Sequence, residues 1–138
     1  MGVLRVVAMV LFGLMFLAEA GDLYGLILTL ADPVPTAERF GISTGSEILR
    51  STVLLILAIV VCIGALFALV GLFLKRPPLF RRGALACALG YVVYGLYQVA
   101  DGVLQVSSTV VVVAGLIYVV LGGLAFAMYR SVYETSSP

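Results

Sequence analysis

The chain has 138 residues, of which 63% are hydrophobic and only 11% are charged, and its formal net charge is +1. Its mean hydropathy of +1.23 excludes a soluble globular domain and indicates a membrane protein. The net charge gives no reason to expect a nucleic-acid partner, so the lipid bilayer is the partner that the composition predicts.

The first apolar segment covers about residues 3–30 and contains two acids, Glu19 and Asp22. Two interpretations of this segment stay open. Arg5, the apolar run behind it and the AEA tripeptide at 18–20 match a cleaved signal peptide. Cleavage, however, would leave GDLYGLILTL as an apolar stub too short to cross a membrane, which favours an uncleaved spanning helix.

Residues 31–49 are the longest polar segment and are predicted to form an outer loop. Asp32-Pro33 ends the first helix, and Glu47 lies in the first turn of the second, where the helix dipole favours an acid. Arg50 follows Glu47 by three residues, so we expect the two side chains to pair across one turn.

Three further segments are apolar enough to span the membrane, because about 20 apolar residues in a helix cross the hydrocarbon core. They cover about residues 50–74, 83–103 and 108–130, with an inner loop at 75–82. A bilayer offers no water to backbone groups, so these segments must be helical. The predicted fold class is all-α, a polytopic membrane protein with one four-helix transmembrane bundle over 1–138.

Six of the eight basic residues fall on one side of the membrane if the chain crosses it four times. They are Arg5, Lys75, Arg76, Arg81, Arg82 and Arg130. Because basic residues accumulate on the cytoplasmic side, we expect a multi-pass protein of the cell membrane with both termini cytoplasmic. KRPPLFRR at 75–82 is interpreted as a topology anchor rather than as a lipid-headgroup or nucleic-acid patch.

An internal similarity suggests two parallel copies of one helical hairpin. FGLMFLAEAG at 12–21 aligns with YGLYQVADGV at 94–103, and this places Glu19 opposite Asp101. Both copies would start and return on the same side of the membrane. Small residues are expected to allow close helix contact on two faces, one with Gly64, Ala68 and Gly71 and one with Gly123 and Ala127.

Acidic and polar side chains cluster in the outer half of the predicted bundle. Glu19 and Asp22 share a face of the first helix, and Asp101 continues a polar stripe on the third. A central Asp facing lipid would cost on the order of 2–3 kcal/mol, so the stripe is expected to face the interior. The candidate ligand-binding or proton-carrying residues are Glu19, Asp22, Tyr94, Tyr97, Gln98 and Asp101.

The three acids of this cluster have no predicted basic partner inside the membrane. Desolvation and mutual repulsion disfavour three ionised carboxyls, so at least one is expected to hold a proton. A structural role stays open as well, since Asp22 and Asp101 lie near helix ends, where a carboxyl can reach the headgroup region.

Catalytic, metal and cofactor motifs are not evident. The chain has no histidine, and no glycine-rich phosphate loop precedes a helix. Cys62 and Cys87 are predicted at depths that differ on the order of 10 Å, which exceeds the reach of a disulfide. We therefore expect no enzyme activity, no catalytic residue, no metal and no cofactor.

Several short features resemble the small DoxX-like four-helix membrane proteins. These features are Asp32-Pro33, Phe40-Gly41, Glu47, Arg50 and Asp101-Gly102. The resemblance implies a four-helix bundle with membrane-embedded partners or small hydrophobic ligands, and no uniform reaction. Members often carry an arginine in the third helix ahead of the acid, where this chain has Tyr94, Gly95 and Gln98, so a shared ligand is in doubt.

The predicted function is binding of a small apolar or weakly basic ligand, or of a partner membrane protein, at the outer acidic cavity. Two alternatives stay open, a small proton-coupled transporter and an assembly subunit of a larger membrane complex. The transporter would act as a homodimer, because 138 residues make a narrow bundle.

Overall fold

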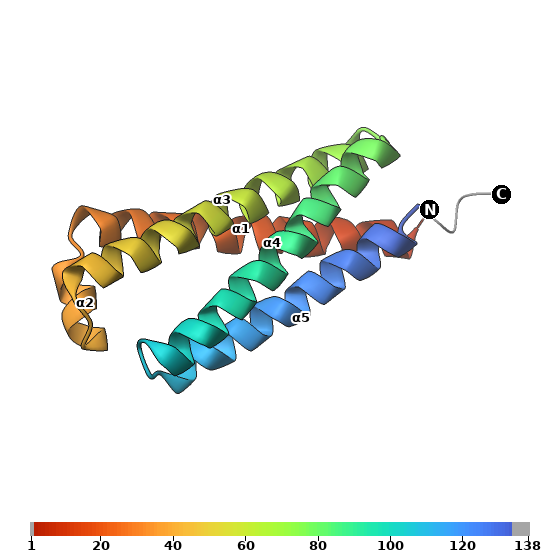
Figure 1. The fold of residues 1–138 in the computed structure, drawn as a ribbon. Coiled ribbons are helices and arrows are strands. Elements are labelled where there is room, and N and C mark those ends of the chain that lie inside the picture. The colour runs from red at the N-terminus through yellow and green to blue at the C-terminus, as the bar shows by residue number, and fades with distance from the viewer. Residues whose placement is uncertain (1, 134–138) are drawn as a thin grey trace.

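The computed structural model describes residues 2–133, which form five helices (Figure 1). They are α1 (Val3–Ala31), α2 (Val34–Phe40), α3 (Thr44–Phe73), α4 (Pro77–Leu104) and α5 (Thr109–Ser131). All except α2 are long and apolar enough to cross a membrane. The predicted all-α fold class is confirmed, and the chain is an integral membrane protein.

The four long helices form two antiparallel pairs, α1 with α3 and α4 with α5, which cross each other (Figure 1). Backbones approach closely within each pair and between α3 and α4. Helix α1 reaches α4 and α5 mainly through side chains, such as the Phe12 and Phe80 rings, whose centroids are 5.8 Å apart. This arrangement leaves an interior lined by side chains. The duplication of one hairpin stays a prediction.

The segment 31–49, predicted as a loop, is largely helical. Helix α2 follows Pro33 and is capped by Gly41, whose φ of 67° lies in the left-handed region that glycine adopts most easily. It lies across the end of the bundle and packs on α3 (Figure 1). The predicted loop therefore supplies a short helix over the interior.

Helix α3 also begins earlier than the predicted span of 50–74. Ser43 caps it, since the Ser43 hydroxyl oxygen accepts a hydrogen bond from the Ser46 N–H at 3.1 Å. The first helical residue is Thr44, so Arg50 lies in the second turn of a membrane helix. The sequence patterns underestimated this helix because its first turn is polar and the cap lies inside the polar segment.

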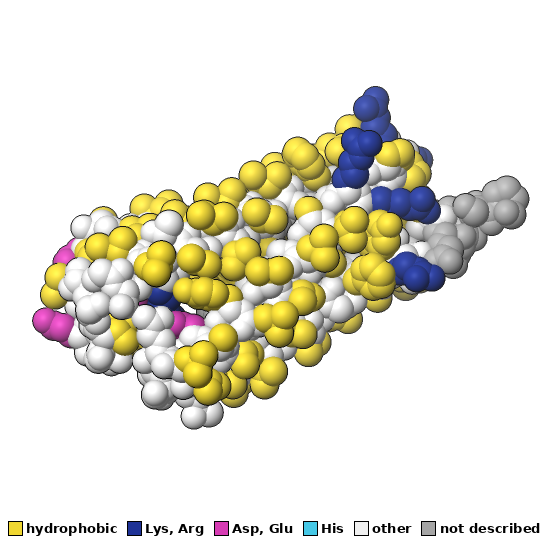
Figure 2. All heavy atoms as spheres, in the orientation of Figure 1, with side chains coloured by type: hydrophobic (Ala, Val, Ile, Leu, Met, Phe, Trp, Pro, Cys, Tyr) yellow, Lys and Arg dark blue, Asp and Glu magenta, His cyan; other side chains and the backbone are white. Residues whose placement is uncertain are grey.

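The segment 75–82 is a tight turn followed by the first turns of α4, whereas the sequence predicted a loop. Pro77 and Pro78 occupy the first two helical positions, where a missing N–H breaks no helical hydrogen bond. We call this end of the bundle the basic end, and the end that carries α2 the loop end. The basic end carries Arg5, Lys75, Arg76, Arg81, Arg82 and Arg130, and Lys and Arg side chains gather there in Figure 2.

Small residues set the distance between α3 and α4. The predicted face of Gly64, Ala68 and Gly71 is buried. Opposite it, a Cβ atom on Gly83 would lie only 2.6 Å from the carbonyl oxygen of Gly64. The second predicted face makes no such contact within the described chain, because a Cβ atom on Gly123 would have no neighbour within 4 Å.

Candidate functional site

A cavity of about 320 Å³ opens at the loop end of the bundle. All five helices contribute to its walls. Its charged and hydrogen-bonding lining residues include Asp22, Thr36, Glu47, Arg50, Gln98 and Tyr118. In Figure 2 the surface is hollowed at this end, and basic and acidic side chains are visible in the hollow. An otherwise apolar bundle thus contains one polar interior space at this end.

Arg50 is the centre of a buried ion cluster in the wall of the cavity. Its Nε donates a hydrogen bond to Oδ2 of Asp101 on α4, and its Nη1 lies 3.3 Å from Oε1 of Glu47. The Arg50 side chain is 8% exposed and that of Glu47 is fully buried. The Ser51 hydroxyl donates to Glu47 at 2.9 Å. The cluster therefore compensates charges that would be costly to bury alone.

The ion cluster confirms one sequence-based prediction and corrects another. Glu47 and Arg50 pair across one turn, as expected. The expectation that the membrane acids have no basic partner is wrong for Asp101, which pairs with Arg50. The reason is the early start of α3, which carries Arg50 into the bundle and within reach of α4.

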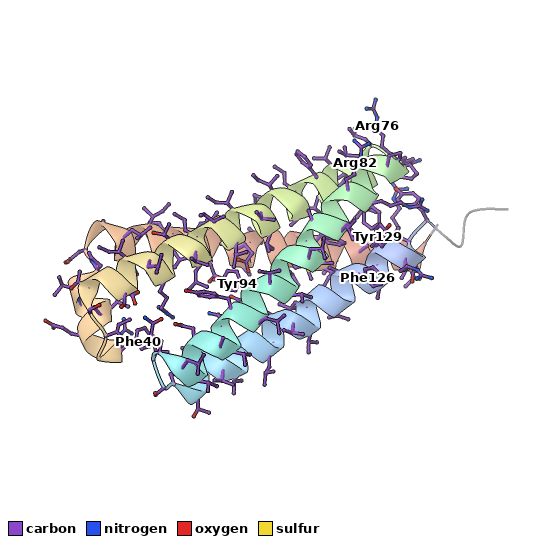
Figure 3. All side chains as sticks on the ribbon, in the orientation of Figure 1. Phe40, Arg76, Arg82, Tyr94, Phe126 and Tyr129 are labelled. Carbon is purple, nitrogen blue, oxygen red and sulfur yellow. The ribbon has the colours of Figure 1, made fainter. Side chains whose placement is uncertain are left out.

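Helix α2 covers the ion cluster from the loop end. The Arg50 guanidinium carbon lies 4.8 Å from the centroid of the Phe40 ring, a cation–π contact that also shields the charge from water. Thr36 of the same helix lines the cavity. Figure 3 shows that Phe40 and Tyr94 both lie toward the space between the two helix pairs.

Asp22 is held in place from α5. The Tyr118 hydroxyl donates a hydrogen bond to Asp22 Oδ2 at 2.6 Å, and the Tyr118 ring packs against Tyr94 with centroids 4.6 Å apart. Glu19, one turn away on the same helix, is a further neighbour of Asp22 and interacts with it electrostatically, but its carboxyl oxygens make no hydrogen bond of ordinary geometry with a described residue. Asp22 therefore presents a fixed, half-buried carboxyl to the cavity.

Glu19 does not line the cavity, although it was predicted to share one with Asp101. It lies one turn nearer the basic end and is fully buried. Neither of its carboxyl oxygens makes a hydrogen bond of ordinary geometry with a described residue, and the same holds for the neighbouring Tyr91 hydroxyl. Glu19 is thus a fully buried acid that, like Asp22, has no ion pair with a described residue.

Tyr97 and Asp101 contribute to a different hollow. They line a smaller cavity of about 200 Å³ together with Ala100 and Leu104 of the same helix and Gln105, which follows it. The structure therefore brings Asp22, Tyr94 and Gln98 together at the main cavity, while Glu19, Tyr97 and Asp101 lie around it.

Several residues of the site were not among the sequence candidates, and four of them form its ion cluster or bind Asp22. They are Glu47, Arg50, Ser51 and Tyr118. The first three continue to Leu54 at helical spacing, a pattern that marks one face of a helix and that the predicted boundary between loop and helix, at residues 49 and 50, divided. Tyr118 is the sole hydroxyl-bearing residue between 110 and 128, and this isolation was the available signal.

Comparison of the chain with protein-family models, curated proteins and solved structures finds no match. The resemblance to the DoxX-like proteins therefore stays a prediction. Among the described residues no group of three or more His, Cys, Asp or Glu side chains is placed to hold a metal ion. What the site offers is a fixed arrangement of hydrogen-bond acceptors.

Proposed function

We propose that this integral membrane protein binds a small protonated amine in the loop-end cavity. The observation that carries the proposal is a set of acceptor oxygens without donors. The Gln98 side-chain oxygen is buried without a hydrogen-bond partner in the described chain, and the hydrogen bond from Tyr118 engages one of the two Asp22 oxygens, Oδ2. Both residues line the cavity, and an ammonium group supplies the donors that they lack.

The balance of charge also favours a cation. The guanidinium of Arg50 is engaged by Glu47 and Asp101, so the Asp22 carboxyl has no basic partner among residues 2–133. A purely apolar ligand would bury these polar groups unpaired, at a cost of about 1–3 kcal/mol for each. The volume of about 320 Å³ lies at the lower end of the range for small-molecule sites.

The structure gives more support to ligand binding than to proton transport through one copy of the chain. Between Glu19 and the basic end the buried core is apolar, with Phe12, Leu72 and Phe80 among its members. A proton relay needs successive polar groups, and the described core does not provide them there. The proton-coupled transporter, the homodimer and the assembly subunit stay predictions.

Amine binding can be tested by thermal unfolding of the detergent-purified protein. We expect phenethylamine to raise the melting temperature progressively with its concentration, whereas 2-phenylethanol, which has a similar shape but no charge, has little effect. A free amine concentration a hundred times Kd corresponds to about 2.7 kcal/mol of stabilisation. Asp22→Asn should abolish the response, since the amide can keep the Tyr118 hydrogen bond but cannot ionise.

Asp32→Asn is the matched control, because Asp32 is an exposed acid outside the cavity. It should respond to the amine as the unaltered protein does. Equal stabilisation by the alcohol, or a full response in Asp22→Asn, would show that the cavity does not select a cation through Asp22.

For the orientation we propose that the basic end is cytoplasmic, which the gathering of Lys and Arg at that end supports. A cysteine in place of Ser43, at the loop end, should react with a membrane-impermeant maleimide added to intact cells. A cysteine in place of Pro78, at the basic end, should react only after lysis. Both positions are exposed. The unaltered protein controls for Cys62 and Cys87, and the opposite labelling pattern would invert the topology.

A further inference from the structure

The basic end contains a cleft that the proposed function does not use. Its volume is about 440 Å³, and its walls are Lys75, Arg76, Pro77, Pro78, Leu79 and Arg82. The three basic residues are exposed and form no ion pair with a described residue. Arg76 and Arg82 are labelled at this end in Figure 3, where Arg76 projects away from the bundle.

The backbone at the cleft is shaped by an unusual residue. Lys75 has a φ of 55°, in the left-handed region that residues with a side chain seldom occupy. This conformation turns the chain sharply between α3 and α4 and sets Lys75 and Arg76 beside Arg82. Basic residues that only set the membrane orientation need to lie near the membrane on the cytoplasmic side. They need neither a cleft nor a left-handed residue in the turn, so these two features call for another explanation.

The chemistry of the cleft suits a phosphate group. Guanidinium groups hold phosphate oxygens through paired, charge-assisted hydrogen bonds. Pro77 and Pro78 have no N–H, so an anion here would be bound by side chains rather than by the helix terminus. Immediately before the turn, Phe73 is 69% and Leu74 is 59% exposed, so the chain next to the cleft offers apolar surface.

We propose that the cleft of Lys75, Arg76 and Arg82 binds a phosphate group, and that an anionic phospholipid supplies it. The exposed apolar side chains of Phe73 and Leu74, which directly precede Lys75, favour a lipid over a free phosphate, because an acyl chain can pack on them. This site lies at the opposite end of the molecule from the amine cavity and does not depend on it.

The experiment is native mass spectrometry of the full-length protein in detergent, titrated with dioleoyl phosphatidylglycerol. We expect the protein to retain this lipid and to bind dioleoyl phosphatidylcholine more weakly. Arg76→Gln and Arg82→Gln should each weaken retention about five-fold. Arg81→Gln is the matched control, since Arg81 is an exposed neighbour with the same charge that does not line the cleft.

The Arg81→Gln control distinguishes a specific phosphate site from attraction of anionic lipid by the net positive charge of this end. If Arg81→Gln weakens retention as much as Arg82→Gln does, net charge explains the binding and the site is refuted. Inorganic phosphate is the second arm. Displacement of the lipid by millimolar phosphate would support a phosphate site and refute the lipid as its specific source, whereas binding of neither probe would overturn the proposal. Melting temperatures of the variants should equal that of the unaltered protein, because the substituted side chains are exposed.

Discussion

Replacing Arg50 by methionine is expected to lower the free energy of unfolding by roughly 3–5 kcal/mol. The substitution keeps a long side chain against Phe40 but removes the charge that Glu47 and Asp101 share. Both carboxyls would then remain buried without a cation. An uncompensated buried charge is the reason why removing one partner of a buried ion pair is strongly destabilising. Chemical unfolding of the detergent-purified protein, followed by circular dichroism, measures the loss.

Removing the acids as well should recover most of that stability. In the triple variant Arg50→Met, Glu47→Gln and Asp101→Asn, no charge remains to be compensated, and the Gln side chain can still accept from the Ser51 hydroxyl. Arg39→Met is the matched control: Arg39 also approaches Phe40, at 5.9 Å, but it is exposed, so the change should stay within about 0.5 kcal/mol. A stable Arg50→Met protein would mean that the cluster contributes little to folding.

Gly83→Ala is expected to destabilise the bundle by about 2–3 kcal/mol, because one methyl group would overlap backbone rather than flexible side chains. The added Cβ would overlap the Ala68 backbone nitrogen and lie 2.6 Å from the Gly64 carbonyl oxygen. Helices α3 and α4 would have to move apart, and they carry Arg50 and Asp101. We therefore expect Gly83→Ala to lose amine binding as well as stability. Chemical unfolding measures the loss of stability, and the missing melting-temperature shift with phenethylamine measures the loss of binding.

Gly123→Ala provides the comparison within the same bundle. It adds the same methyl group to a membrane helix at an exposed position with no neighbour within 4 Å. Because alanine forms helices more readily than glycine, its effect should be neutral or slightly stabilising. Equal stability of the two variants would show that the close approach of α3 and α4 is not a constraint on the fold.

The sequence by itself determined that the protein lies in a membrane, that its fold class is all-α, and in which part of the bundle the acidic and tyrosine side chains gather. Uncharged runs of spanning length in an apolar chain leave helices as the available structure, because a bilayer cannot satisfy free backbone groups. The resulting four long apolar helices are present in the structure. The grouping of acids and tyrosines toward the loop end was also visible, since helical spacing assigns residues to faces.

Only the tertiary structure decided which polar residues meet. Arg50 and Asp101 are 51 positions apart, and their contact depends on how α3 and α4 rotate and cross. Periodicity gives the face of each helix but not the neighbour that it meets. The contact of Tyr118 with Asp22, 96 positions away, has the same origin.

The residues that sequence patterns misassigned lie where helix ends are polar. Hydropathy detects the apolar centre of a spanning helix, so the capped first turns of α3 and the short helix α2 resembled a loop. The predicted spanning segment began only at Arg50, at the edge of the bundle, and Asp101 was therefore left without its partner. A charge buried on one helix is compensated by an opposite charge on another helix, as Arg50 and Asp101 show. Such a pair can be identified only once the packing of the helices is known.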